Sequence, residues 1–271
     1  MPSIELNNVS VMFPVYSAGS RSLKNALVAA TTGGRIGSES KHLVIQALDQ
    51  VSMQFRDGDR VALIGHNGAG KTTLLRVLAG IYEPRVGSVR IEGRVTPMFD
   101  INLGIDPEST GYENIILRGL YLGLTRAEIL ARRDSVAEFT ELGPFLDIPV
   151  RTYSAGMQAR LAFAMATCIE PEILLLDEGI GAGDASFLEK ANERLDHFIK
   201  KAGILVLASH SIDLVRRLCN RAVLMEHGRM VWAGPIEEGL THYYQRQVAA
   251  AAAAAAAEAA PAWPAPAAVA G

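Results

Sequence analysis

The chain has 271 residues, 49% of them hydrophobic and 20% charged, and its formal net charge is −3. These values are ordinary for a globular protein with a sizeable core, and the mildly acidic balance does not favour a nucleic-acid partner. The N-terminus lacks a signal-peptide pattern, and there is no run of about 18 or more apolar residues to span a bilayer as a helix. We therefore expect a cytoplasmic protein that reaches any membrane through a partner.

The first part of the chain is predicted to be rich in strands. Residues 4–13 alternate between apolar and polar side chains, which is typical of a half-buried strand. Residues 17–43 are rich in Gly and Ser and contain a helix-like piece at 22–30, so we interpret them as an insertion. Residues 47–55 and 60–65 are again predicted strands, and the second has the apolar pattern of a buried one.

The segment that follows, GHNGAGKTT, fits the phosphate-binding P-loop pattern. Its glycines let the backbone curl so that N–H groups point at phosphate oxygens, and the helix that opens near Lys71 adds its positive end. Lys71 would reach the β- and γ-phosphates, Thr72 would ligate Mg²⁺, and the helix is predicted to end at Gly80. The predicted nucleotide-binding residues are Gly65, His66, Asn67, Gly68, Ala69, Gly70, Lys71, Thr72 and Thr73.

The middle of the chain is predicted to be mainly helical. Short strands occupy 87–95, and residues 111–145 then show helical periodicity. Thr125 and Glu128 have the spacing of a capping box, which predicts the start of a helix. Residues 154–169 are predicted to form a further helix.

The last part alternates strands with helices, which predicts an α/β sheet with right-handed crossovers. Residues 246–271 form an Ala/Pro-rich low-complexity tail, whose alanines can extend the preceding helix. Before that tail the predicted elements are an apolar strand at 172–178, a helix at 185–201, a strand at 204–210, a helix at 211–219 and a hairpin at 221–234.

Two cysteines, Cys168 and Cys219, lie in apolar stretches without CxxC spacing or a Cys/His cluster. This pattern predicts reduced thiols rather than a disulfide or a zinc site.

An acidic pair ends the apolar strand at 172–178. Ligands bind at the carboxyl ends of strands in open α/β sheets, and Asp177 would hold Mg²⁺ there through water. Glu178 is then free to polarise a water against the γ-phosphate, and general-base help of this kind is typically worth about 10²–10⁴ in rate. With the P-loop, the pair predicts hydrolysis of a bound nucleotide.

These motifs, in this order, resemble those of ABC-type ATPases. The sequence YSAGM stands where that family has its signature, and it opens a predicted helix. The resemblance implies that Ser154, Ala155 and Gly156 contact the γ-phosphate bound to a second subunit. A hydroxyl and N–H groups at a positive helix end suit that role.

The resemblance implies roles for further residues. Asp184, in GAGD, matches the carboxylate of the family's D-loop, and His210 matches the switch histidine that hydrogen-bonds the γ-phosphate. Phe13 lies where the family stacks an aromatic ring on adenine, with Tyr16 as an alternative, although Phe13 could equally be a core residue. The family's Q-loop usually carries Gln, whereas this chain has Asp100 at that position, which is implied to contact Mg²⁺ or the attacking water.

Within this family the chain resembles the nucleotide-binding subunits of bacterial cell-surface polysaccharide exporters, which include O-antigen, teichoic-acid and capsule exporters. The YSAGM signature, the sequence FDINLGIDPESTGYENI and the insertion at 17–43 carry this likeness. It implies an α/β fold: an ABC-type P-loop ATPase core with a mixed sheet and flanking helices, a small antiparallel β subdomain and an inserted helical subdomain. The ATPase domain would span 1–245, with the helical subdomain and signature at about 100–165.

The resemblance also implies cofactors and partners. ATP and Mg²⁺ would be sandwiched in a head-to-tail homodimer that works with an integral-membrane permease in two copies, and a lipid-linked polysaccharide would be the transported substrate. The protein would lie peripherally on the cytoplasmic face of the inner membrane. The helical subdomain and the loop at 100–112 would pass closure to the permease, and the helix at 22–30 would gate the glycan. Glycan recognition would lie in the membrane subunit or in a separate protein.

Three alternatives stay open on the sequence. One is the ATPase of another ABC transporter, either an importer or an exporter of small molecules or lipids. Another is an ABC protein acting on ribosomes or DNA, although such proteins usually have two cassettes. The third is a nucleotide-binding regulator without turnover, against which the presence of Glu178 argues.

Overall fold

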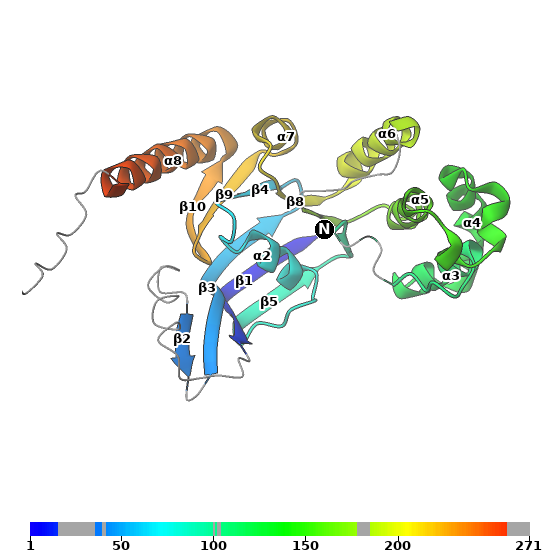
Figure 1. Ribbon diagram of the computed structural model, residues 1–271, viewed down its shortest axis with the longest axis horizontal. Coiled ribbons are helices and arrows are strands. Elements are labelled where there is room, and N and C mark those ends of the chain that lie inside the picture. Colours follow the sequence, from blue (N-terminus) through cyan, green and yellow to red (C-terminus); the bar gives the residue numbers. More distant parts are fainter. Residues whose placement is uncertain (16–35, 40–41, 100, 102–103, 178–184, 259–271) are drawn as a thin grey trace, which may run out of the picture.

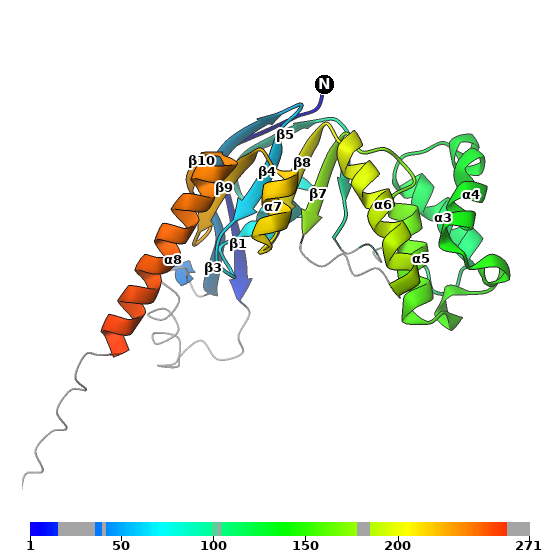
Figure 2. The same ribbon diagram turned by 90° about the horizontal axis from the view of Figure 1, so that it is seen from above.

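The computed structural model describes residues 1–15, 36–39, 42–99, 101, 104–177 and 185–258 (Figures 1 and 2). Two sheets form its centre, and helices cover them and extend to one side. The helix-like piece predicted at 22–30 lies outside the described residues.

One sheet is antiparallel, with strand order β2-β3-β1-β5. The end of the segment predicted as an insertion forms a strand that was not predicted: Ile36 pairs with Ile45 and Glu39 with His42, which extends the sheet. This pairing joins residues that the periodicity of a single strand does not connect. The strands are β1 (Ser3–Val15), β2 (Ile36–Glu39), β3 (His42–Arg56) and β5 (Val86–Glu92).

The other sheet is mixed, as predicted, with strand order β10-β9-β4-β8-β7-β6. Within it, adjacent strands from β9 to β6 run parallel, and β10 pairs with β9 as an antiparallel hairpin. The strands are β4 (Arg60–Ile64), β6 (Val95–Pro97), β7 (Ile173–Asp177), β8 (Ile204–Ala208), β9 (Arg221–Glu226) and β10 (Arg229–Pro235).

Strand β4 shows why the parallel strands are apolar throughout. Val61 and Leu63 pack into a core shared with α2 (Lys71–Leu78) and the antiparallel sheet. Ala62 and Ile64 point into a second core on the opposite face of the sheet. Burial on both faces requires near-continuous apolar residues, which fixes the strand as central.

The second core is covered by α6 (Ala185–Lys201), α7 (Ile212–Leu218) and α8 (Ile236–Glu258). The predicted extension of the last helix into the alanine run is confirmed, because α8 continues to Glu258. Among the described residues, no helix is both long enough and apolar enough to cross a membrane.

We call α3, α4 and α5, with the short helices η1 and η2, the helical subdomain. It lies beside the sheets, as Figures 1 and 2 show. The capping box of Thr125 and Glu128 is confirmed at the start of α4. The elements are α3 (Gly111–Tyr121), α4 (Arg126–Thr140), η1 (Gly143–Asp147), η2 (Val150–Thr152) and α5 (Ala155–Ala166).

The cysteines are unpaired, as predicted. Cys219 is buried, and burial raises the pKa of its thiol to about 12. Burial also raises the pKa of the Cys168 thiol. Both groups therefore stay protonated at neutral pH, which makes them poor nucleophiles.

Candidate active site

The candidate site lies at the carboxyl edge of three neighbouring parallel strands, β4, β8 and β7. Leu63 of β4 and Asp177 of β7 both pair with Ala208 of β8, so the strands end at one level. The P-loop follows β4, His210 follows β8, and Asp177 ends β7. The fold thus brings three separately predicted elements to the edge where such sheets bind ligands.

Two positions of the P-loop need glycine, because backbone atoms of neighbouring strands lie too close to leave room for a side chain. A Cβ atom on Gly65 would overlap the carbonyl oxygen of Met225 in β9. Gly70 has a φ of 107°, in the left-handed region, and a Cβ there would lie 2.9 Å from the carbonyl oxygen of Ala47. A side chain at either position would displace the loop from the sheets that support it.

Lys71 begins α2 and is only 9% exposed. Its Nζ donates to the carbonyl oxygens of Gly65, at 2.6 Å, and of His66, at 3.1 Å. A buried ammonium group needs such partners, and here they hold it across the loop. The positive charge is therefore fixed where an anion bound by the loop would lie.

The N-terminus of α2 suits an anionic ligand. Within the described part of the chain, no side chain caps this helix, and its first turn contains no acidic residue. By contrast, a hydroxyl side chain caps each of α3, α4 and α5. Asn67 and Thr72 are exposed beside this end, and Thr73 is half-buried. Uncapped N–H groups and the helix dipole together favour phosphate.

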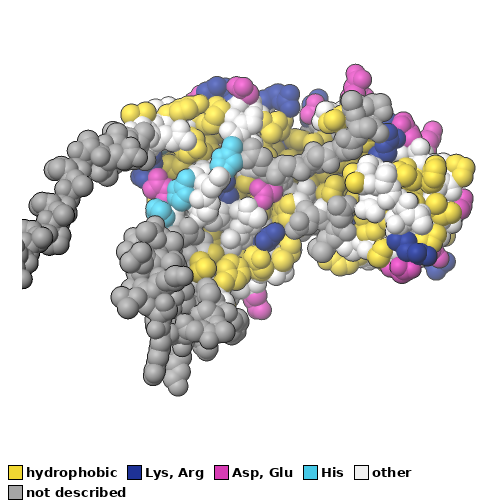
Figure 3. Space-filling view, viewed as in Figure 1, with side chains coloured by type: hydrophobic (Ala, Val, Ile, Leu, Met, Phe, Trp, Pro, Cys, Tyr) yellow, Lys and Arg dark blue, Asp and Glu magenta, His cyan; other side chains and the backbone are white. Residues whose placement is uncertain are grey.

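The β9–β10 turn braces the P-loop from the other side. Ala69 is buried; its N–H donates to the His66 carbonyl at 3.0 Å, and its own carbonyl accepts from the Gly228 N–H at 2.8 Å. Histidine side chains gather on this face in Figure 3, and the rings of His66 and His227 lie 4.9 Å apart. Sequence reasoning missed this brace, for which the glycine of the hairpin turn was the only local signal.

A cavity of ≈ 320 Å³ lies beside the P-loop. His210 lines it together with Gly65, His66 and Asn67, so the predicted switch histidine does reach the P-loop. Tyr243, Arg246 and Gln247 of α8 also line the cavity, and no motif in the sequence indicated them. The structure therefore supports placing His210 with the P-loop.

The signature segment lies elsewhere. Ser154 is the N-cap of α5, and its Oγ accepts a hydrogen bond from the Met157 N–H at 3.3 Å. Ser154 and Ala155 are exposed, and Gly156 is half-buried. Figures 1 and 2 show α5 in the helical subdomain, apart from α2. The fold of one chain does not bring the signature to its own P-loop.

Phe13 is part of a packed cluster near the end of β1. Its ring lies edge-on to Tyr82, with centroids 5.1 Å apart, and it packs partly buried against the core shared with α2. The ring is half-buried, so its stacking on adenine stays a prediction. The remaining predicted site residues, Glu178, Asp184 and Asp100, and the alternative Tyr16, lie outside the described residues.

The donor set fits a nucleotide with Mg²⁺. The described residues contain no group of three or more His, Cys, Asp or Glu side chains that could hold a metal ion by themselves. Mg²⁺ is usually bound by one or two protein oxygens together with substrate phosphates. Thr72 at the start of α2 and Asp177 at the strand edge offer such oxygens beside the phosphate-binding loop.

Known proteins resemble this chain in sequence and in fold. The family described as "ABC transporter" matches residues 48–181. The dimeric ATP-binding cassette MJ0796, in a post-hydrolysis state with ADP and Pi, has a TM-score of 0.60 at 22% identity and covers 86% of this chain and 98% of its own. At this identity the likeness shows the fold, which is that of an ABC ATPase cassette.

Sequence relatives are much closer. The O-antigen export system ATP-binding protein RfbE of Yersinia enterocolitica is 49% identical over 84% of this chain and 96% of its own length. RfbB of Klebsiella pneumoniae, of the same description, is 38% identical over 90% of this chain and 98% of its own length. The fold, the order of the motifs and these identities agree. The chain belongs to the ATP-binding proteins of ABC transporters.

Proposed function

We propose that this chain binds and hydrolyses ATP to power the export of a lipid-linked cell-surface polysaccharide across the cytoplasmic membrane. One observation supports the ATPase part most directly: the P-loop, His210 and Asp177 stand at the ends of three neighbouring parallel strands that finish at one level. The choice of substrate rests on the relatives named for O-antigen export, which align over nearly their whole length.

The P-loop binds the triphosphate of ATP. Backbone N–H groups of residues 65–70 and the start of α2 receive the phosphate oxygens, and Lys71 neutralises charge on the β- and γ-phosphates. Thr72 and, through water, Asp177 would hold Mg²⁺, which supplies further neutralisation of the phosphate charge. Phe13 stacks on the adenine.

Hydrolysis is an in-line displacement at the γ-phosphorus. Glu178 orients a water molecule and accepts its proton, while His210 hydrogen-bonds the γ-phosphate. The bond from water oxygen to phosphorus forms as the bond to the β-phosphate oxygen breaks, giving ADP and phosphate. Asp100, in place of the usual Gln, would contact Mg²⁺ or this water.

Two copies pair head to tail and enclose two ATP molecules. The separation of Ser154 from its own P-loop supports this arrangement, because the exposed start of α5 is then directed to the γ-phosphate of the other copy. Asp184 belongs to the same interface. ATP binding closes the dimer, and release of phosphate lets it open.

In the cell, the ATPase domain at 1–245 would act peripherally on the cytoplasmic face of the membrane. Its helical subdomain would transmit closure to a permease present in two copies. The antiparallel sheet, the mixed sheet and the helical subdomain support the division predicted from the sequence.

Deleting the gene should abolish surface polysaccharide and leave the lipid-linked glycan on the cytoplasmic side. The wild-type gene should restore export, whereas a Lys71→Ala gene should not, because transport needs bound ATP. The measurement is glycan analysis of intact and lysed cells, with the total glycan as the control for synthesis. Normal surface polysaccharide in the deletion strain would contradict the export function and favour another class of ABC transporter.

A further inference from the structure

A buried amide on α3 links the loop that follows Asp100 to the residues that lead into the signature. Asn114 is 1% exposed. Its Nδ2 donates to the carbonyl oxygens of Asp106 and Thr110, both at 2.9 Å, and of Ser109 at 3.3 Å. Its Oδ1 accepts from the Asp106 N–H at 2.8 Å. A single side chain thus holds both ends of the loop 106–110 against the helix.

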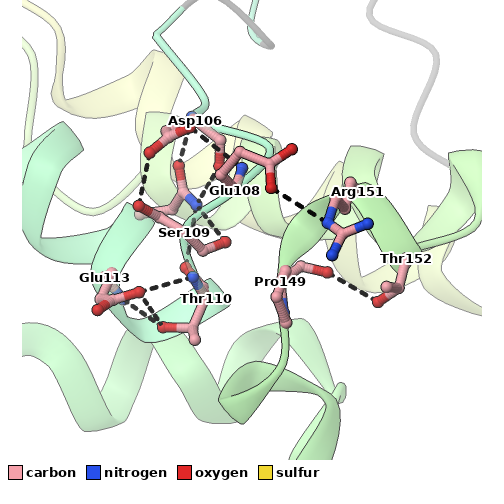
Figure 4. Close-up of polar contacts among 9 residues, drawn as sticks. Asp106, Glu108, Ser109, Thr110, Glu113, Pro149, Arg151 and Thr152 are labelled. Carbon is pink, nitrogen blue, oxygen red and sulfur yellow. Dashed lines mark hydrogen bonds and ion pairs between the residues drawn. The ribbon is translucent and has the colours of Figure 1, made fainter.

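The same loop lies beside the segment before α5, and Figure 4 shows the ion pair between Glu108 and Arg151 that joins them. The Val150 N–H donates to the Ser109 carbonyl at 3.0 Å, and the Arg151 N–H donates to the Pro107 carbonyl at 2.8 Å. Thr110 forms an isolated antiparallel bridge with Pro149. These backbone contacts join the loop directly to residues 149–151.

The short path from there to the signature is also constrained. Tyr153, which is 6% exposed, donates its N–H to the Val150 carbonyl at 2.9 Å and its hydroxyl to the Phe145 carbonyl at 2.6 Å. A Cβ on Gly111 would lie 2.6 Å from the Tyr153 hydroxyl, so the first residue of α3 touches the residue before Ser154. The N-cap of α5 therefore follows the position of the loop.

Further polar side chains contact the loop 106–110 and its surroundings. Asp106 accepts from the Ser109 hydroxyl at 2.6 Å and from the Glu108 N–H at 3.1 Å, and these bonds lower the pKa of its carboxyl. Farther along α3, Arg118 is 7% exposed, and its guanidinium lies beside the loop at Gly104. Asp106 is exposed, whereas the Asn114 amide is buried and bonded through both its nitrogen and its oxygen, so the amide favours one arrangement of the loop.

We infer that Asn114 is a positioning residue, which couples the loop following Asp100 to the signature at Ser154 and so sets the signature's placement against the ATP of the second copy. This inference rests on the proposed head-to-tail ATPase. Asn114 acts only on the second half-site, so its loss should spare ATP binding to the P-loop of its own chain.

The test measures ATP-driven dimerisation of the full chain by sedimentation, in a Glu178→Gln background that blocks turnover. Asn114→Ala should weaken dimerisation about tenfold, within the range by which linking residues alter coupling. The affinity of a single chain for a fluorescent ATP analogue should stay unchanged. A general loss of stability would weaken both dimerisation and ATP binding, so the two measurements distinguish it from a loss of positioning.

Thr140→Val is the matched control. Thr140 is also fully buried in the helical subdomain, where its hydroxyl donates to the Ala137 carbonyl at 2.6 Å and accepts from the Leu142 N–H at 3.2 Å, and these contacts do not involve the loop. It should lower the thermal midpoint while leaving dimerisation nearly normal. Equal loss of dimerisation in both variants, at equal loss of thermal stability, would overturn the inference.

Tyr153→Phe keeps the test decisive if Asn114→Ala does not fold. It removes one hydroxyl and no packing, and it should weaken dimerisation in the same direction without changing ATP affinity. Normal dimerisation of this folded variant would count against the inference. If the Glu178→Gln parent itself forms no ATP-dependent dimer, the proposed function fails. That failure can be told apart from failure of the inference, because the parent still has Asn114.

Discussion

Replacing Glu178 by glutamine is expected to lower ATP turnover by about 10²–10⁴-fold, the usual contribution of a general base. Glutamine keeps the size of the side chain but cannot accept the proton of the attacking water. ATP should still bind, because Lys71 and the start of α2 hold the phosphates independently of residue 178. The variant should therefore accumulate as a closed, ATP-loaded dimer.

Two measurements check this expectation: phosphate release at saturating ATP, and the sedimentation of the chain with and without ATP. Glu189→Gln in α6 is a suitable control, since Glu189 is an exposed carboxylate outside the strand edge. It should hydrolyse ATP at the parent rate. Near-normal turnover in Glu178→Gln would remove Glu178 from the role of general base.

Lys71→Ala should weaken ATP binding itself, by about 10–100-fold, which is the range for one lost hydrogen bond to a charged group. The lysine would do two things: its charge would neutralise the phosphates, and its Nζ bonds the start of α2 to the carbonyls of Gly65 and His66. Alanine removes both. Turnover should fall with the affinity, because both depend on the same ammonium group.

Titration with a fluorescent ATP analogue measures this loss, and a thermal melt shows whether the variant is folded. Lys190→Ala is the matched lysine control, since Lys190 pairs with Glu141 on the helical subdomain side, with the lysine side chain 40% exposed. Its ATP affinity should equal that of the parent. An unchanged affinity in Lys71→Ala would refute the assignment of the P-loop.

Local signals in the sequence predicted most of the elements. The helix predicted at 185–201 matches α6, and the helix after the P-loop ends as expected: the Gly80 N–H bonds to the Val77 carbonyl and the Ile81 N–H to the Arg76 carbonyl. These features depend on spacing and on glycine conformation within a few residues. The capping box of Thr110 and Glu113 on α3 was equally local and was missed.

Long-range contacts could not be predicted in the same way. The register that sets Asp177 level with the end of β4 depends on the pairing of strands distant in the chain. The brace between Ala69 and Gly228 and the contribution of α8 to the cavity beside His210 have the same origin. A sequence motif identifies the residues of the site, whereas the long-range contacts that hold those residues in place depend on tertiary packing.

The separation of Ser154 from its own P-loop has a functional consequence. In the proposed head-to-tail dimer, each P-loop would lack residues to cover the γ-phosphate, and hydrolysis would depend on a second copy. Binding energy can then be used to bring two chains together, which is what a transport cycle needs. On this account, the single chain binds ATP and the pair hydrolyses it.

Mixing two inactive variants tests that claim most directly. Lys71→Ala inactivates the P-loop, and Gly156→Asp places a carboxylate at the signature. Residue 156 has room for a Cβ atom, because the nearest neighbour, Ser154 Oγ, would be 3.9 Å away. Each variant alone should release almost no phosphate. The equal mixture should recover about one quarter of the parent rate, since about half of the dimers are mixed and each has one intact site. A mixture no more active than its separate components would contradict a site shared between two copies.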